Sequence, residues 1–162
     1  MTIMSRILSE DESICNQYVK QLALSVLNDW IKLWWNKLPD QRKGDVKQLA
    51  MDLLSSNLSI HENSSIRTKI AVIMSNVAER IFPQYWPTFM QEMVALWLSS
   101  PFSRQDVILK LLETVIVDSI DTDFNSILPT LRRQEIVAGI VDAQKLLFDT
   151  SYQFMGYSFQ EY

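Results

Sequence analysis

The amino-acid sequence predicts an all-α fold in which helical hairpins stack into a superhelix, or solenoid. Apolar residues recur with the period of an amphipathic helix through most of the 162 residues. No segment alternates apolar and polar residues over a useful length, as a half-buried strand does. Only 3 glycines and 5 prolines occur, which favours long regular elements. An aromatic turn between Pro83 and Pro87 separates two of the expected helices.

The first helix is expected from about Asp11 to Asn36, and the second from about Gln41 to Asn57. The first carries two adjoining apolar stripes, so we expect neighbours to contact it on more than one side. Asp40, in the turn between the helices, is expected to cap the second one. The first stripe is Ile14, Tyr18, Leu22 and Val26, and the second is Leu27, Trp30, Ile31 and Trp34. The expected buried face of the second helix is Val46, Leu49, Ala50, Leu53 and Leu54.

A polar segment from Ser55 to Ser65 is expected to be a loop with an exposed His61. The third helix then follows to Ile81, where Pro83 ends it, because proline lacks an N–H and clashes one turn back. Pro87 suits the first turn of the fourth helix, Thr88–Leu98. The third helix has one apolar stripe: Ile66, Ile70, Ile73, Val77 and Ile81. We expect the aromatic residues Phe82, Tyr85, Trp86 and Phe89 to crowd this corner, whose structural residues are Pro83, Trp86 and Pro87.

The fifth helix is expected from about Ser103, as the capping residue, to Ile120. Phe102 and Val107 have the spacing of a hydrophobic staple. After a connection from Asp121 to Pro129, the sixth helix runs from Thr130 to about Tyr152. The inward residues of the fifth helix are Val107, Ile108, Leu111, Leu112, Val115 and Ile116. Those of the sixth are Ile136, Ile140, Ala143 and Leu147.

The six helices group into three hairpins, roughly 11–57, 65–98 and 103–152. Their starting points are roughly 40 to 55 residues apart, close to the period of ~40–47 in HEAT and armadillo repeats. A HEAT-type solenoid region of about three hairpins is therefore expected. A compact bundle with short loops is the structural alternative.

Composition and motifs argue against catalysis. Cys15 is the only cysteine and His61 the only histidine, and there is no Gly-rich phosphate loop and no Cys/His metal cluster. We therefore assign no catalytic, cofactor-binding or metal-binding residue and expect no enzyme. No apolar run approaches the roughly 20 residues of a membrane span, so no membrane partner is expected. We expect the five tryptophans to serve core and repeat packing rather than a ligand site.

Charge is informative about partners. The net charge of −4 does not favour nucleic-acid binding by the whole chain, and leaves room for a basic protein partner. Arg132 and Arg133, at the start of the sixth helix, are expected to form a solvated face rather than a phosphate contact.

The corner Pro83-Gln84-Tyr85-Trp86-Pro87, followed by Thr88-Phe89 and an apolar helix, resembles the P-x-x-W-P corner of the exportin branch of the importin-β (karyopherin-β) superfamily. The preceding SVLNDWIKLWWNKLPDQRKGDVKQLAMDLL and the later DTDFNSILPTLRRQEIVAGI are similar to the flanking exportin repeats. The loop, Leu-Pro and double Arg are most like the exportin five branch, which exports double-stranded RNA and microRNA precursors. The resemblance runs from Ile14 to Tyr152 and implies N-terminal HEAT repeats of a longer receptor.

The resemblance also implies partners. A nuclear export receptor of this family shuttles between nucleus and cytoplasm, binds the small GTPase Ran in its GTP form together with cargo, and meets nucleoporins as a full-length chain. The cargo, a protein or a structured double-stranded RNA, stays open. Family members bind Ran-GTP on the concave face lined by the second helix of each repeat, here roughly Gln41–Asn57, Thr88–Leu98 and Thr130–Tyr152.

Exposure, rather than a family motif, selects the candidate Ran-binding residues. Asp45, Gln48 and Asp52 share an outward face of the second helix, and Gln91 and Glu92 are the polar residues of the fourth. Two other function classes remain open: a non-transport helical-repeat scaffold or adaptor, and a small ligand-binding helical bundle. Binding of Ran-GTP would distinguish a transport receptor from a scaffold or adaptor. A closed apolar pocket of several hundred Å³ would favour the second.

Overall fold

The structure, a computed structural model, describes residues 17–120 and 129–160. Within these residues every regular element is a helix and no strand occurs, so the predicted all-α fold is confirmed. The elements are α2 (Gln17–Trp34), the 3-10 turn η1 (Trp35–Lys37), α3 (Asp40–Ser55), α4 (Leu58–His61), α5 (Ser64–Ile81), α6 (Phe89–Leu98), α7 (Phe102–Ile120) and α8 (Thr130–Gln160).

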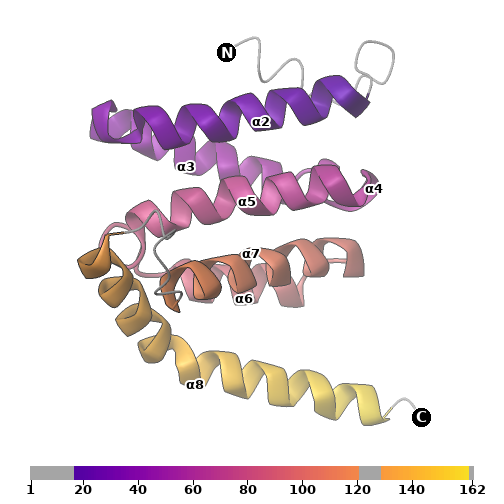
Figure 1. Ribbon diagram of the computed structural model, residues 1–162. Helices are drawn as coiled ribbons and strands as arrows, with labels where there is room; N and C mark the ends of the chain where they lie inside the picture. Colours follow the sequence, from indigo (N-terminus) through magenta and orange to yellow (C-terminus); the bar gives the residue numbers. More distant parts are fainter. Residues whose placement is uncertain (1–16, 121–128, 161–162) are drawn as a thin grey trace.

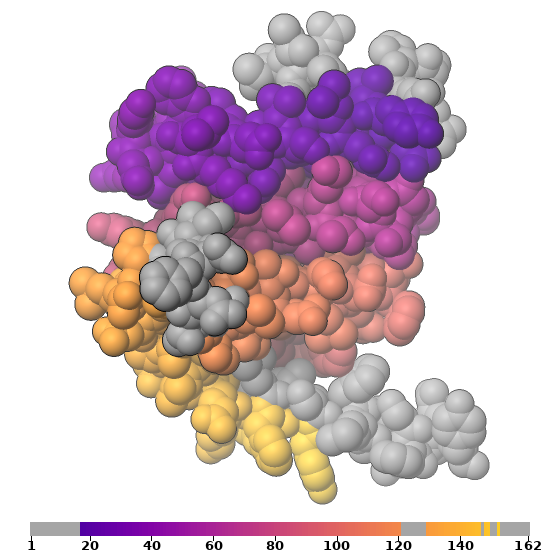
Figure 2. All heavy atoms as spheres, in the orientation of Figure 1, coloured from indigo at the N-terminus to yellow at the C-terminus, as the bar shows by residue number. Residues whose placement is uncertain are grey.

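The helices stack in the order of the sequence (Figure 1). Helices α2, α5 and α7 form one row, in which α5 packs against both neighbours. Helices α3 and α6 lie behind that row, and α8 lies at the lower end, where it contacts α6 and α7. Figure 2 shows the same succession on the surface, from α2 at one end to α8 at the other. Such an open stack, in which each layer contacts mainly its neighbours, is the HEAT-type arrangement.

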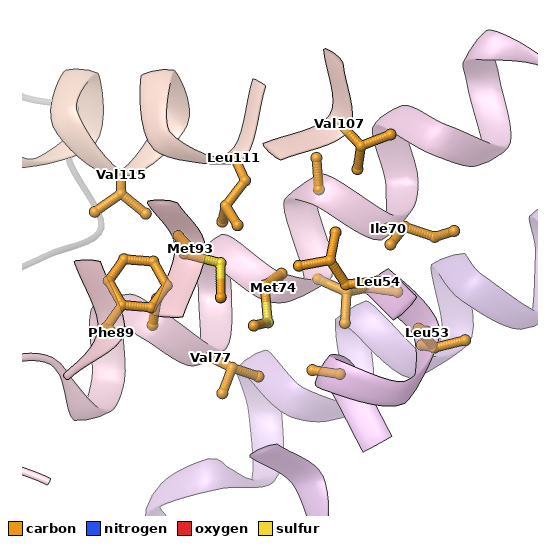
Figure 3. Packing of buried hydrophobic residues seen from close by; sticks show 14 of the residues in the cluster. Leu53, Leu54, Ile70, Met74, Val77, Phe89, Met93, Val107, Leu111 and Val115 are labelled. Carbon is orange, nitrogen blue, oxygen red and sulfur yellow. The ribbon is translucent and has the colours of Figure 1, made fainter. Parts of the chain in front are cut away.

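Helix α5 is the centre of the fold, because α2, α3, α4 and α7 all pack against it. Its predicted apolar stripe is buried, and so are Ala71, Met74 and Ala78 outside that stripe. A helix that is apolar around most of its circumference is typical of an interior position. Figure 3 shows side chains of α3, α5, α6 and α7 meeting in one core: Leu53, Leu54, Ile70, Met74, Val77, Phe89, Met93, Val107, Leu111 and Val115.

Helix α2 buries only part of one of its two predicted stripes. In the second stripe Leu27 and Ile31 are buried, but Trp30 and Trp34 are exposed, so the expected core role is wrong for these two tryptophans. In the first stripe Tyr18, Leu22 and Val26 are exposed. The expectation that both stripes are covered is therefore wrong for the part of α2 that the structure describes; Ile14 lies outside it. The contact between α2 and α5 also has a polar margin. It includes hydrogen bonds from Lys69 to Ser25 and from the amide of Asn76 to that of Asn28. Lys20 of α2 also donates to Glu62, which lies between α4 and α5.

The aromatic corner joins α5 to α6. The N–H of Phe82 donates to the carbonyl of Ala78 at 2.8 Å, and this bond closes the last turn of α5 just before Pro83. Phe82, Trp86 and Phe89 are each at most 2% exposed, and the Phe89 ring centroid lies 5.0 Å from that of Trp86. Tyr85, which we expected in the same cluster, is 83% exposed. Pro87 is exposed in the turn before α6.

Several predicted helix starts are shifted. Helix α3 begins at Asp40 itself and Pro39 holds the cap position, so Asp40 is not the cap; its carboxylate instead accepts from Lys43. Helix α7 begins at Phe102, so Ser103 is not its cap, and the carbonyl of Pro101 accepts from the N–H groups of Arg104 and Gln105. Phe102 is 83% exposed, which excludes the predicted staple with Val107.

Two other segments differ in length from the prediction. The expected polar loop contains the one-turn helix α4, in which Leu58 and Ser59 are buried, although His61 is exposed as expected. Helix α8 continues beyond Tyr152 to Gln160. Of its predicted inward residues, Ile136 and Ala143 are buried and Ile140 is half-buried, while the side chain of Leu147 lies outside the described ones.

Candidate functional site

The five candidate contact residues lie on α3 and α6. Asp45, Gln48 and Asp52 are exposed on α3, Gln91 is exposed on α6, and Glu92 beside it is half-buried. Both helices belong to the row behind α2, α5 and α7 (Figure 1). The structure therefore places all five on one row of helices. Among the described residues, no hydrogen bond or ion pair joins the α3 group to the α6 group.

Local contacts orient these carboxylates without burying them. Asp45 accepts from Arg42 at 3.5 Å, an exposed pair that adds little stability. Gln48 donates to Asp52 at 2.8 Å, one turn further along α3. Thr88 donates to Glu92, whose charge in the first turn of α6 suits the positive end of the helix dipole. Carboxylates held in this way on rigid helices can accept hydrogen bonds from lysine or arginine side chains of a partner.

Arg104 of α7 holds the end of α3 in place. Its Nε donates to the Ser59 hydroxyl at 2.9 Å, and a terminal nitrogen donates to the carbonyl of Ser55 at 2.6 Å and to that of Ser56 at 3.1 Å. The carbonyls at the end of a helix have no partner within the helix, so this arginine supplies one from the next layer. Sequence reasoning missed this contact, because nothing local marks a partner that lies 45 or more residues away.

Arg132 ties α8 to the aromatic corner. Its Nε donates to the carbonyl of Glu79 at 2.8 Å, and its terminal nitrogens donate to the carbonyl of Phe82 and to the side chains of Gln84 and Glu135. The side chain is only 18% exposed. The expectation of a solvated arginine face is therefore wrong for Arg132. Carbonyl groups at the end of a helix have no donor within it, and those at the end of α5 accept from this side chain instead.

Glu79 is a buried acid between the stacked helices, only 6% exposed. Burial, and then the charge of Asp118 and a hydrogen bond to it, raise the pKa of Glu79 to about 8. Arg80 and Lys32 oppose that rise. Near pH 7 the carboxyl group is therefore mostly protonated, and a protonated carboxyl can donate to the carboxylate of Asp118 on α7.

Neither a membrane span nor a metal cluster occurs in the part of the chain that the structure describes. None of its helices combines the length and the apolar character needed to cross a bilayer. Within residues 17–120 and 129–160, no three side chains of His, Cys, Asp or Glu come together as a metal site.

Comparison with known proteins gives consistent matches. A family model for Exportin 1-like protein matches residues 63–160. Exportin-5 of Dictyostelium discoideum is 26% identical over 149 residues, which are 91% of this chain and 13% of that protein. Exportin-5 of Mus musculus is 27% identical over 123 residues, 73% of this chain and 10% of that protein. Protein EXPORTIN 1A of Arabidopsis thaliana is 30% identical over 105 residues, 61% of this chain and 10% of that protein.

Proposed function

The chain belongs to the Exportin 1-like family, and on that premise we propose that it is part of a nuclear export receptor that binds Ran-GTP and cargo. The single observation that supports this most is the family match, which spans residues 63–160 of a HEAT-type stack. The chain spans only about a tenth of the length of the relatives it matches. The proposed function is therefore that of a longer receptor, and it consists of binding, without catalysis.

Three repeats are proposed within the chain, with α2 and α3, α5 and α6, and α7 and α8 as successive hairpins near 11–57, 65–98 and 103–152. The row formed by α2, α5 and α7 supports this division, since the first helices of stacked hairpins lie side by side. The second helices then form the other row, on which the exposed carboxylates of α3 and α6 lie.

Ran-GTP would bind the row of second helices. Asp45, Asp52 and Glu92 would meet a basic patch on Ran, which contributes more to association rate and specificity than to affinity. Ran-GTP and cargo would each favour the same curvature of the complete solenoid, so that each raises the affinity for the other. GTP hydrolysis would release both. Such a receptor shuttles between nucleus and cytoplasm and contacts nucleoporins on the way.

The test is a pull-down of Ran by a receptor that contains these repeats, with Ran loaded with GTP or with GDP. We expect strong retention of Ran-GTP and little of Ran-GDP. Equal retention of the two forms would remove the main support for transport, and would favour a helical-repeat scaffold or adaptor instead.

A second experiment tests the residues. Reversing charge in Asp45→Lys, Asp52→Lys and Glu92→Lys together should slow association and weaken its dependence on salt. A control reverses two carboxylates, Asp106 and Glu113, which are exposed on α7 in the other row, and is compared with Asp45→Lys and Asp52→Lys without the third change. The triple variant can leave the association rate and its salt dependence unchanged although the receptor still prefers Ran-GTP to Ran-GDP. In that case the family function stands and the choice of contact residues is wrong.

A further inference from the structure

The start of α3 and the end of α5 lie at the same side of the stack (Figure 1). Residues of these two helix ends and of η1 line a basic hollow. Its volume is about 340 Å³. Lys43 and Lys47 line it from α3, and Arg80 lines it from the last turn of α5. Three cations at one hollow stand out in a chain whose net charge is −4. Among the residues that the structure describes, Asp40 is the one acidic residue that lines it.

The positive charge of the hollow is poorly compensated. Asp40 accepts from Lys43 at 2.9 Å, but this carboxylate is 97% exposed, where such a pair contributes little. The Lys47 Nζ lies 4.0 Å from the Trp86 ring centroid, and no carboxylate pairs with it among the described residues. Arg80 donates to the backbone and side chain of Asn76 on its own helix. Its neighbour Glu79 is mostly neutral near pH 7, because burial raises the pKa of that carboxyl to about 8.

The remaining walls are apolar. Trp35 and Ile81 are buried beside the cations, and the ring of Tyr85, which is 83% exposed, stands at the rim. Gly44 leaves space on the α3 side, since a Cβ built there would meet nothing within 4 Å. A hollow with apolar walls and a few convergent charged groups fits a side chain better than a plain ion.

We propose that the basic hollow binds an acidic peptide segment of a partner protein, with an apolar side chain seated among Trp35, Ile81 and Tyr85 and flanking carboxylates paired with Lys43, Lys47 and Arg80. A nucleic acid suits the hollow less well. Affinity for nucleic acid grows with the number of phosphates neutralised, and only three cations gather here. The exposed carboxylates of Asp45 and Asp52 on the same helix would also repel a long polyanion.

The hollow is separate from the proposed Ran-binding face. At about 100° per residue, the centre of the group Asp40, Lys43, Gly44 and Lys47 lies roughly 120° around the α3 axis from the group Asp45, Gln48 and Asp52. Variants in one group therefore need not disturb the other, and the two proposals can fail independently.

The experiment titrates the full chain with a short fluorescent peptide in which a phenylalanine lies between glutamates. Gly44→Leu should block the hollow with its own side chain, and Gly44→Ala is the matched control that leaves room. Lys43→Met with Lys47→Met removes two charges but keeps the apolar stems, and the exposed Lys110→Met on α7 is its control. Thermal melts show whether each variant is folded.

We expect saturable binding that weakens with salt, a roughly tenfold or greater loss in Gly44→Leu and in the double lysine variant, and no change in either control. A peptide with glutamines in place of glutamates should not bind. No saturable binding below about 1 mM, or binding that Gly44→Leu leaves intact, would overturn the proposal. So would a duplex RNA that binds more tightly than the peptide and is blocked by the same variants, since the ligand would then be nucleic acid.

Discussion

Glu79→Gln should make the folded chain more stable at alkaline pH. The side chain of Glu79 is 6% exposed, and its pKa rises from 4.5 to about 8, first because of burial and then because of Asp118. The folded state therefore holds this proton more tightly than the unfolded state between those two values. Stability contributed by Glu79 is fully present below pH 4.5 and is lost as pH rises toward 8. Glutamine keeps the shape and a hydrogen-bond donor for Asp118 without the charge.

The size of the effect follows from the pKa rise. Taken in full, a rise from 4.5 to about 8 corresponds to about 5 kcal/mol, which is an upper limit for the gain of the variant above pH 8. Relaxation of the protein and entry of water lower the free-energy cost of ionising Glu79 in the folded chain. We therefore expect Glu79→Gln to be more stable than wild type by about 2–4 kcal/mol at pH 9, with little difference at pH 5.

Urea unfolding followed by tryptophan fluorescence measures this, at several pH values between 5 and 9. The quantity compared is the difference in free energy of unfolding between variant and wild type at each pH. Glu113→Gln on α7 is the matched control, because the Glu113 side chain is 64% exposed. A difference for Glu79→Gln that is the same at pH 5 and pH 9 would refute the reasoning.

Three further predictions concern packing. Trp86→Ala should lower the free energy of unfolding by about 3–5 kcal/mol in a denaturant titration, because the ring is 1% exposed; a loss below about 1 kcal/mol would show that the aromatic corner is not structural. Gly139→Ala should lower the melting temperature, because the new Cβ would lie 2.6 Å from an atom of the Phe82 ring. Gly44→Ala should raise it, because the new Cβ meets nothing within 4 Å and alanine is more favourable than glycine in a helix by roughly 1 kcal/mol. Equal changes in melting temperature for the two variants would contradict the packing. The isolated chain should self-associate at micromolar concentration through the exposed apolar stripe of α2 and the end of α8, and sedimentation of a clean, heat-stable monomer would contradict an open stack.

Helical periodicity predicted the core well. The buried faces of α3, α5 and α7 were predictable because an apolar period of 3.6 residues reflects burial on one side of a helix. Periodicity does not say which neighbour covers a stripe, so it could not show that Tyr18 and Leu22 stay exposed on α2. Helix starts shifted at Asp40 and Ser103, since a capping residue one position away fits the same local pattern.

The contacts that fix the layers could not be predicted from the sequence. Arg104 and Arg132 bind carbonyl groups at the ends of helices in other layers, and an arginine near a helix start looks the same in sequence when it is solvated. The exposure of Asp45 and Asp52 followed from their spacing on one helix face. Their contact with a partner stays a prediction. The basic hollow depends on Lys47 of α3 and Arg80 of α5 lining one space, which no local pattern marks.

Amide hydrogen exchange of a receptor that contains these repeats, with Ran-GTP and with Ran-GDP, is the most direct test of the proposed partner face. We predict slower exchange in α3 and α6 with Ran-GTP and no change with Ran-GDP, while the exposed side of α2 and α7 exchanges as in the free receptor. Protection that is the same with both nucleotides, or that is confined to α2, α5 and α7, would contradict the proposed binding of Ran-GTP by the second helix of each repeat.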